Sequence, residues 1–449
     1  MINLIKKLNI EKLGALLIII CMALLPATEL VCALLDQPFL LQEDTVIFLG
    51  LWSVILLLLM VLKNSEIRFY KSDIIIAVLF FFAILSLIFT KDMEQSLYGN
   101  KLSYREGIMV FFSYYITAFL ASRIVDIKNR KKILITFFVL AMFETLIGIL
   151  QFNGIWPYPA LFGDTVHIGE SAFGFPTGAF GFTENSNFFA ALAVVFTGLT
   201  AGLFLLSKGI FRRLFLFLTA FCFYGVIATQ ARLGLLGIIG AFCYLILISI
   251  IAHKQKLNLE PLTRKNLCQL GGIFIVVYII SILLDPSVLA TLLKFKTEIS
   301  SCDINNLGSY RMLIWREGLE TVPHYWYIGT GLDNYVYSFF WDNPDYTGYY
   351  QDKGHNEYIH ILVTQGVFAL ATWLTLIFYN LVTSTKRFFY TSNEETKITF
   401  ILIVMYGGYL CQALANSSVT NVAIYNWIIT GLLLYTGDKK PLKTIKLPT

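Results

Sequence analysis

The sequence predicts an all-α polytopic membrane protein of about 12 transmembrane helices, with a large, partly helical extracytoplasmic loop between helices 9 and 10. Composition is the first observation: 57% of the 449 residues are hydrophobic, 14% are charged, and the mean hydropathy is +0.69. A soluble domain carries about 25% charged residues, so this chain is too apolar for that class. The other two observations are the length of its apolar runs and the distribution of its basic residues.

The apolar runs are long enough to cross a bilayer. A helix needs about 20 apolar residues to span a hydrocarbon core of about 30 Å. The first run is too long, and too free of a small-residue cleavage site, for a removed signal peptide. Twelve runs qualify as candidates, and they cover approximately residues 13–35, 45–62, 73–90, 108–124, 133–152, 188–206, 211–230, 233–252, 267–284, 359–383, 397–415 and 422–436.

The basic residues predict the orientation of the chain. With a cytoplasmic N-terminus, 25 of the 34 lysines and arginines fall on the inside, as the positive-inside rule requires. Both termini are then cytoplasmic, and the net charge of +5 reflects topology and gives no indication of nucleic-acid binding. Nine basic residues remain outside: Lys91, Lys101, Arg105, Arg232, Lys294, Lys296, Arg311, Arg316 and Lys353.

These runs divide the chain into three parts. Residues 1–284 hold helices 1–9 and two outside loops near 90–107 and 153–187, and residues 359–449 hold helices 10–12 and a cytoplasmic tail. Between them, residues 285–358 form the large outside loop, whose many tyrosines and tryptophans favour a folded subdomain at the membrane surface. In this loop, residues 309–319 predict an amphipathic helix with an apolar stripe of Met312, Trp315 and Leu319.

No sequence feature indicates a cofactor. The chain has no glycine-rich nucleotide loop, and its cysteines and histidines do not have the spacing of a metal site. The candidate functional groups are therefore ordinary side chains of the outside loops.

His355 is the principal candidate, because it ends the large polar loop where the chain returns to an apolar helix. Histidine changes charge near neutral pH, which suits proton transfer, although a loop histidine is often only a solvated surface group. Glu357 and Asp333 are acids that either position His355 or are simply solvated. His360 lies inside the following span, where a packing or hydrogen-bonding role is the simpler interpretation.

Four motifs in a fixed order resemble one family. Residues 354–359 read Gly-His-Asn-Glu-Tyr-Ile, and an arginine–tryptophan helix precedes Ile-Gly-Thr-Gly-Leu-Asp-Asn at 328–334. A Phe-Gly…Asn-Ser-Asn-Phe segment at 180–188 leads into a span, and Gln-Ala-Arg-Leu-Gly at 230–234 has alanine where the family has serine. Over roughly residues 150–383 the chain is similar to the O-antigen ligase and O-antigen polymerase family of bacterial envelope glycosyltransferases.

The resemblance implies glycan transfer from an undecaprenyl-diphosphate-linked donor to a glycan or lipid-linked acceptor, on the outer face of the cytoplasmic membrane. The diphosphate already activates the sugar, so the reaction needs no nucleotide. Arginines would stabilise the charge that grows on the diphosphate, and a histidine would accept the acceptor hydroxyl proton. Membrane lipids are expected partners, whereas nucleic acid is not.

The family's working residues correspond to His355 and Arg311 as catalytic groups. The expected substrate-binding residues are Arg232, Arg316, Lys101, Arg105 and Asn356. Arg311 and Arg316 lie five apart and would not share a helix face, so Arg311 is favoured over Arg316. No motif decides which of Lys91, Lys101 or Arg105 supplies the basic contact from the first loop.

Several alternatives stay open at this point. Arg232 at a helix end is also explained by snorkelling to lipid headgroups. A transporter or flippase of lipid-linked saccharide is the second function class, and Glu144, an acid inside a predicted span, is the residue that favours it. The clustering of basic groups in outside loops favours the enzyme. Ligase and polymerase use the same chemistry, with a slight preference here for polymerisation.

Overall fold

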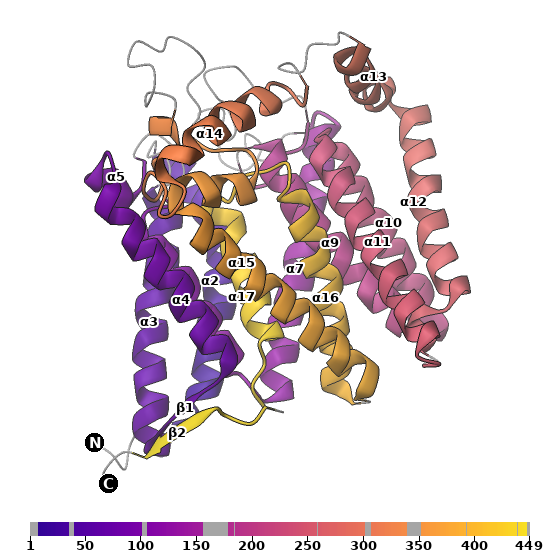
Figure 1. The fold of residues 1–449 in the computed structure, drawn as a ribbon. Helices are drawn as coiled ribbons and strands as arrows, with labels where there is room; N and C mark the ends of the chain where they lie inside the picture. The colour runs from indigo at the N-terminus through magenta and orange to yellow at the C-terminus, as the bar shows by residue number, and fades with distance from the viewer. Residues whose placement is uncertain are drawn as a thin grey trace.

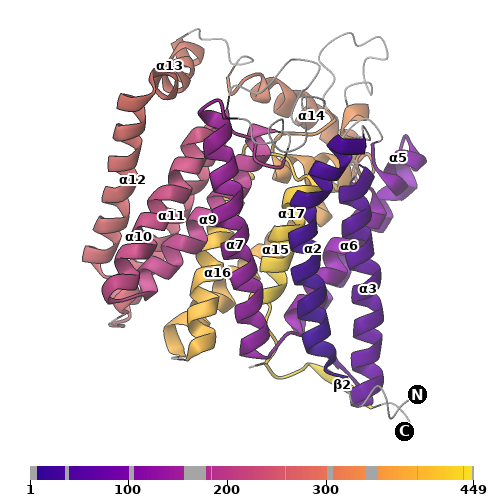
Figure 2. The ribbon, with the colours of Figure 1, turned by 180° about the vertical axis from the view of Figure 1, so that it is seen from behind.

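The chain folds into a bundle of long helices (Figures 1 and 2). The structure is a computed structural model, and it describes residues 8–35, 40–100, 106–155, 178–183, 185–257, 259–300, 307–338, 352–391, 393–437 and 439–446. Lys101, Arg105 and most of the predicted 153–187 loop lie outside these described residues.

Every predicted apolar run overlaps one helix. The helices are α2 (Ile10–Leu35), α3 (Leu40–Asn64), α4 (Lys71–Leu85), α6 (Ile108–Ser122), α7 (Ile127–Phe152), α9 (Ser186–Leu206), α10 (Gly209–Ala228), α11 (Arg232–Lys254), α12 (Arg264–Leu284), α15 (Glu357–Tyr390), α16 (Glu394–Gln412) and α17 (Thr420–Leu433). Within the described ranges, nine helices are long and apolar enough to cross a membrane. A helical membrane fold is thus confirmed, whereas the count of 12 spans is not, because α6 and α17 are short and α16 begins with charged residues.

The centre of the bundle consists of α9, α16 and α17. Helix α9 packs against α10 and α16, while α17 packs against α6, and every residue of α17 is buried. The outer helices instead expose large apolar side chains such as Phe217 on α10 and Leu283 on α12. A bilayer covers such side chains with its acyl chains, so this distribution fits a membrane protein.

Helix α15 is broken at Gly366, where φ is +83°. The break leaves backbone carbonyls of the preceding turn without helical partners. Thr330 N–H donates to Val363 O and Gly331 N–H donates to Thr364 O, each at 2.9 Å. The sequence predicted one continuous span, but the 328–334 motif docks into this gap and satisfies the freed carbonyls.

One end of the bundle carries three further helices, α5 (Met93–Tyr98), α13 (Pro286–Ser300) and α14 (Arg311–Tyr325), and the 3-10 turn η4 (Tyr335–Ser338) (Figure 1). The helix predicted at 309–319 is confirmed as α14, but the stripe of Met312, Trp315 and Leu319 is not its buried face. Met312 and Leu319 are exposed, whereas Ile314, Gly318, Thr321 and Tyr325 are buried. Gly318 decides this orientation, because a Cβ there would lie 2.2 Å from the Tyr335 hydroxyl.

The opposite end carries a small β-ribbon that the sequence did not predict. Strands β1 (Glu66–Phe69) and β2 (Lys443–Lys446) pair antiparallel, with Glu66 opposite Lys446. The 3-10 turns η1 (Ser86–Phe89) and η2 (Glu260–Leu262) complete the elements. The ribbon joins the segment after α3 to the C-terminal tail, and the two segments meet at the end of the bundle opposite α14 (Figure 1).

Candidate active site

His355 lies at the start of α15 in a strained, well-anchored backbone conformation. Its φ is +44°, a left-handed value that only a few residue types adopt readily. Its N–H donates to Ser417 Oγ at 2.9 Å, in the α16–α17 junction. The next residue, Asn356, caps α15, because its side-chain oxygen accepts from Tyr358 N–H at 3.0 Å and Ile359 N–H at 3.1 Å. Asn356 therefore has a structural role, and its contact with substrate stays a prediction.

A chain of hydrogen bonds joins His355 to Arg311. Arg311, the first residue of α14, donates to Asn187 Oδ1 at 3.3 Å. Asn416 Nδ2 donates to Asn187 O at 3.1 Å, and Ser417 N–H donates to Asn416 Oδ1 at 3.0 Å. The two predicted catalytic residues are thus held on one polar framework that also includes the motif at 180–188.

The positive charge of Arg311 affects the pKa of His355. Burial, followed by the positive charge of Arg311, lowers the pKa of His355 to about 4, against a smaller opposing effect of Asp352. The imidazole is therefore neutral at pH 7 and can accept a proton. Burial and then Arg232 lower the pKa of Arg311 to about 10, with Glu298 opposing, so the guanidinium stays charged.

Arg232 does not snorkel freely, because it forms a two-point ion pair with Glu298. The nitrogen–oxygen distances are 2.8 and 2.7 Å, and Arg232 also donates to Ser309 Oγ at 3.1 Å. Hydrogen bonding from Arg232 is the main cause that lowers the pKa of Glu298. Glu298 also accepts Gly308 N–H at 3.1 Å, so the pair fixes the left-handed turn that leads into Arg311. Sequence reasoning missed Glu298, since no motif surrounds it.

The remaining predicted basic residues do not join this group in the described structure. Arg316 pairs with Glu320 at 3.6 Å on the exposed face of α14. Lys91 is exposed, and Lys101 and Arg105 fall outside the described residues. The three residues that the structure brings together are therefore His355, Arg311 and Arg232.

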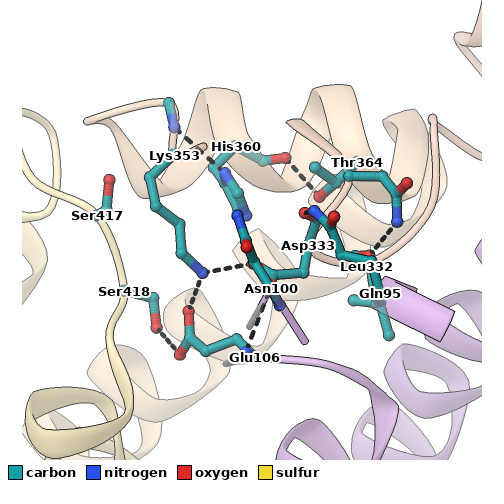
Figure 3. A network of polar contacts seen from close by, with 12 residues as sticks. Gln95, Asn100, Glu106, Leu332, Asp333, Lys353, His360, Thr364, Ser417 and Ser418 are labelled. Carbon is teal, nitrogen blue, oxygen red and sulfur yellow. Dashed lines mark hydrogen bonds and ion pairs between the residues drawn. The ribbon is translucent and has the colours of Figure 1, made fainter. Parts of the chain in front are cut away.

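A buried ionic cluster lies two residues before His355. Lys353 Nζ donates to Glu106 Oε2 at 2.9 Å and to Asp333 Oδ1 at 2.7 Å (Figure 3). All three residues are at most 3% exposed. Burial alone lowers the pKa of Lys353, but the two carboxylates outweigh it and raise that pKa above its ordinary value. The sequence identified Lys353 only as a basic residue of an outside loop. It left two interpretations of Asp333, as a solvated acid or as a residue that positions His355.

The two carboxylates tie separate segments to this lysine. Glu106 Oε1 accepts from Tyr114 OH at 2.8 Å and Ser418 Oγ at 3.0 Å. Asp333 Oδ2 accepts the backbone N–H of Asn100 at 2.6 Å. Burial raises the pKa of Asp333, and Lys353 opposes that effect. The cluster thus joins the α5–α6 segment, the 328–334 motif and the α16–α17 junction beside His355.

A model of the O-antigen ligase family matches residues 215–374, a range that includes Arg232, Arg311, Lys353 and His355. This match supports the assignment of the chain to the O-antigen ligase and polymerase family that the four motifs resemble. No curated protein matches the chain significantly. With its apolar helices, it is a membrane enzyme of the O-antigen ligase or polymerase type, a class that acts in polysaccharide biosynthesis.

Two residues close to His355 in the sequence have structural contacts. His360 Nδ1 accepts Gly354 N–H at 3.3 Å, and its ring stacks on Tyr335 with centroids 5.5 Å apart. The packing interpretation of His360 is therefore confirmed. Glu357 is buried and accepts Tyr409 OH at 3.1 Å, so its interpretation as a solvated acid is wrong.

The acid inside the bundle also has a local partner. Glu144 on α7 accepts Phe182 N–H at 3.2 Å, and Gln151, two turns along the same helix, accepts Phe180 and Gly181 N–H at 3.1 and 2.8 Å. Both side chains thus anchor the 178–183 segment of the ligase-family motif. Among the residues that the structure describes, no three histidine, cysteine or acidic side chains gather as a metal site would require.

Proposed function

We propose that this enzyme transfers or polymerises glycan from an undecaprenyl-diphosphate-linked donor on the outer face of the cytoplasmic membrane. The observation that carries the proposal is the pairing of a neutral histidine with two arginines on one hydrogen-bonded framework at one end of the bundle. A neutral imidazole accepts a proton, and fixed guanidinium groups stabilise diphosphate charge.

In the proposed step, the acceptor hydroxyl oxygen bonds to the anomeric carbon of the donor while the bond from that carbon to the diphosphate oxygen breaks. The hydroxyl proton passes to the His355 imidazole, and the diphosphate leaves with its lipid carrier. Arg311 stabilises the charge that grows on the diphosphate. Arg232 is held by Glu298, so a bound diphosphate would compete with this carboxylate for the Arg232 donors.

An open hollow beside this framework suits the apolar part of the donor. Four apolar side chains line it, Met312, Trp315 and Leu319 of α14 and Ile359, and its volume is about 400 Å³. The ion-paired Arg316 and Glu320 complete the lining. Ile359 lies in the first turn of α15, four residues after His355 in the sequence. The exposed stripe of α14 therefore lies near the reacting end of the molecule, where a lipid carrier would leave the bilayer.

The proposed orientation has both termini in the cytoplasm. It rests on the excess of lysine and arginine on that side and on the position of the β-ribbon at the end of the bundle opposite α14. We favour polymerisation over ligation, with the acceptor a second carrier-linked glycan. The transporter alternative has less support, because Glu144 hydrogen-bonds to a backbone N–H of the 178–183 segment.

The pH dependence of transfer tests the role of His355. Only the neutral imidazole acts as a base, so activity falls as the pH drops through its pKa. In the free enzyme this pKa is about 4, which places the acid limb of kcat/KM near that pH. A bound diphosphate offsets the charge of Arg311, so the acid limb of kcat should lie at higher pH. Coincident limbs near pH 6.5, the ordinary pKa of histidine, would contradict this environment.

Arg311→Ala should lower kcat/KM for the carrier-linked donor by about 10- to 150-fold, since a hydrogen bond to a charged group contributes about 1.5–3 kcal/mol. The measurement is transfer by the purified enzyme over a series of donor concentrations. Lys294→Ala, an exposed change on α13, is the control and should stay within about twofold. Arg316→Ala separates the two arginine candidates, and a loss as large as that of Arg311→Ala would overturn the assignment.

We further propose that the reaction is metal-independent, because the proposed proton and charge roles all belong to His355 and the arginines. Transfer should continue at an unchanged rate after dialysis against EDTA. A rate that falls in EDTA and returns with added Mg²⁺ or Mn²⁺ would refute this part of the proposal.

A further inference from the structure

A cavity of about 490 Å³ lies at the end of the bundle opposite the candidate active site. Its apolar wall comes from α3 and α6, and includes Leu57, Met60 and Phe119. Its polar rim holds four basic residues, Lys63, Arg68, Arg123 and Lys439, against two acids, Glu11 and Glu66. The β-ribbon and the C-terminal tail border its mouth.

The basic residues at this cavity differ in how their charge is used. The charge of Arg123 is already balanced, because its guanidinium pairs with Asp73 at 2.6 Å and lies over the rings of Tyr70 and Phe119. Lys63 instead donates to the neutral carbonyl of Leu8 at 2.7 Å. Lys439 donates to the carbonyl of Leu434 at 3.1 Å. The carbonyl of Leu8 orients the Lys63 ammonium group without neutralising it, so the positive charge of Lys63 remains at the rim.

The ribbon beside the cavity combines charge with exposed apolar side chains. Arg68 and Lys446 are exposed on its two strands, and Lys443 pairs opposite Phe69. Arg68 forms an exposed ion pair with Glu66, and because such pairs contribute little to stability, an anionic phosphate can compete for the Arg68 guanidinium. Phe69, Leu442 and Ile445 are 38, 52 and 39% exposed, although water solvates such side chains poorly. Basic and apolar groups together on one exposed element are typical of a surface that lies on an anionic bilayer.

We propose that this cavity and ribbon form a binding site for an anionic phospholipid. The phosphate of the headgroup lies at Lys63, Arg68 and Lys439, and the first part of an acyl chain packs on Leu57, Met60 and Phe119. The ribbon rests in the headgroup layer, where its exposed apolar side chains leave water. The site is distant from His355, so this inference does not depend on the proposed transfer reaction.

The test compares lipids on the purified full-length protein. Native mass spectrometry in detergent counts retained phosphatidylglycerol and phosphatidylethanolamine, and thermal unfolding is followed with each lipid. We expect stronger retention of phosphatidylglycerol, and about fivefold weaker retention for each basic residue removed. Arg68→Gln with Lys443→Gln should therefore weaken it about 25-fold.

A matched double variant, Arg213→Gln with Lys254→Gln, removes two exposed basic residues from the first turn of α10 and the end of α11. It should retain phosphatidylglycerol as the unmodified protein does, and an equal loss would overturn the site. Lys63→Gln is the single change to use if the ribbon variant misfolds. Equal retention of both lipids, or equal thermal stabilisation by glycerol phosphate alone, would also overturn the assignment to a lipid.

Discussion

Replacing His355 with alanine is expected to slow glycan transfer by about 10²- to 10⁴-fold, the range that general-base catalysis contributes. The imidazole is neutral in the free enzyme because burial and Arg311 disfavour its charged form. Its backbone is held by Ser417, so the residue is placed before substrate arrives. Loss of the base should lower kcat and kcat/KM together, because the proton is transferred only in the transition state.

The experiment measures single-turnover transfer from a synthetic carrier-linked oligosaccharide at matched protein levels. Alanine tolerates a φ of +44° poorly, so His355→Asn is the second variant, since asparagine adopts this conformation more readily. Both variants should lose transfer, and His355→Asn should keep the unfolding midpoint of the unmodified protein. His324→Ala, an exposed change at the end of α14, is the histidine control. Unmodified rates in both His355 variants would remove it from the reaction.

Hydropathy predicted the helices because each apolar run must lie against lipid or a neighbouring helix. It could not predict features decided by single close contacts. The buried face of α14 depends on Gly318 meeting the Tyr335 hydroxyl, and the break in α15 depends on backbone docking at Gly366. Strands of four residues, such as β1, carry too little periodicity to distinguish them from loop.

The sequence predicted the proposed reacting residues of the site but not the residues that hold them in place. His355, Arg311 and Arg232 lie in short sequence motifs, so they can be identified from the sequence alone. Their supports come from distant segments: Lys353 and Glu106 are 247 residues apart, and Asn416 and Asn187 are 229 apart. The one available signal was the polar run Asn-Ser-Ser at 416–418 between two apolar runs, which marks a loop at the membrane surface.

Lys353→Met should destabilise the protein by about 3–5 kcal/mol, the usual cost of removing one partner from a buried ion pair. Methionine fills much the same space but leaves Glu106 and Asp333 buried together without a cation. The expected observation is a clear fall in the thermal unfolding midpoint in detergent. Transfer should also fall at temperatures where the variant is still folded, because Lys353 holds the segment that leads into His355.

The matched control is Lys397→Met, which breaks an exposed pair with Glu394 at 2.5 Å. Exposed pairs contribute about 0.2–1 kcal/mol, so the unfolding midpoint should barely change. Adding Glu106→Gln and Asp333→Asn to Lys353→Met removes the uncompensated charges and should recover part of the lost stability. If Lys353→Met unfolds at the same temperature as Lys397→Met, the buried cluster does not stabilise the start of α15, and the placement of His355 must depend on its contacts with Ser417 and the Asn356 cap.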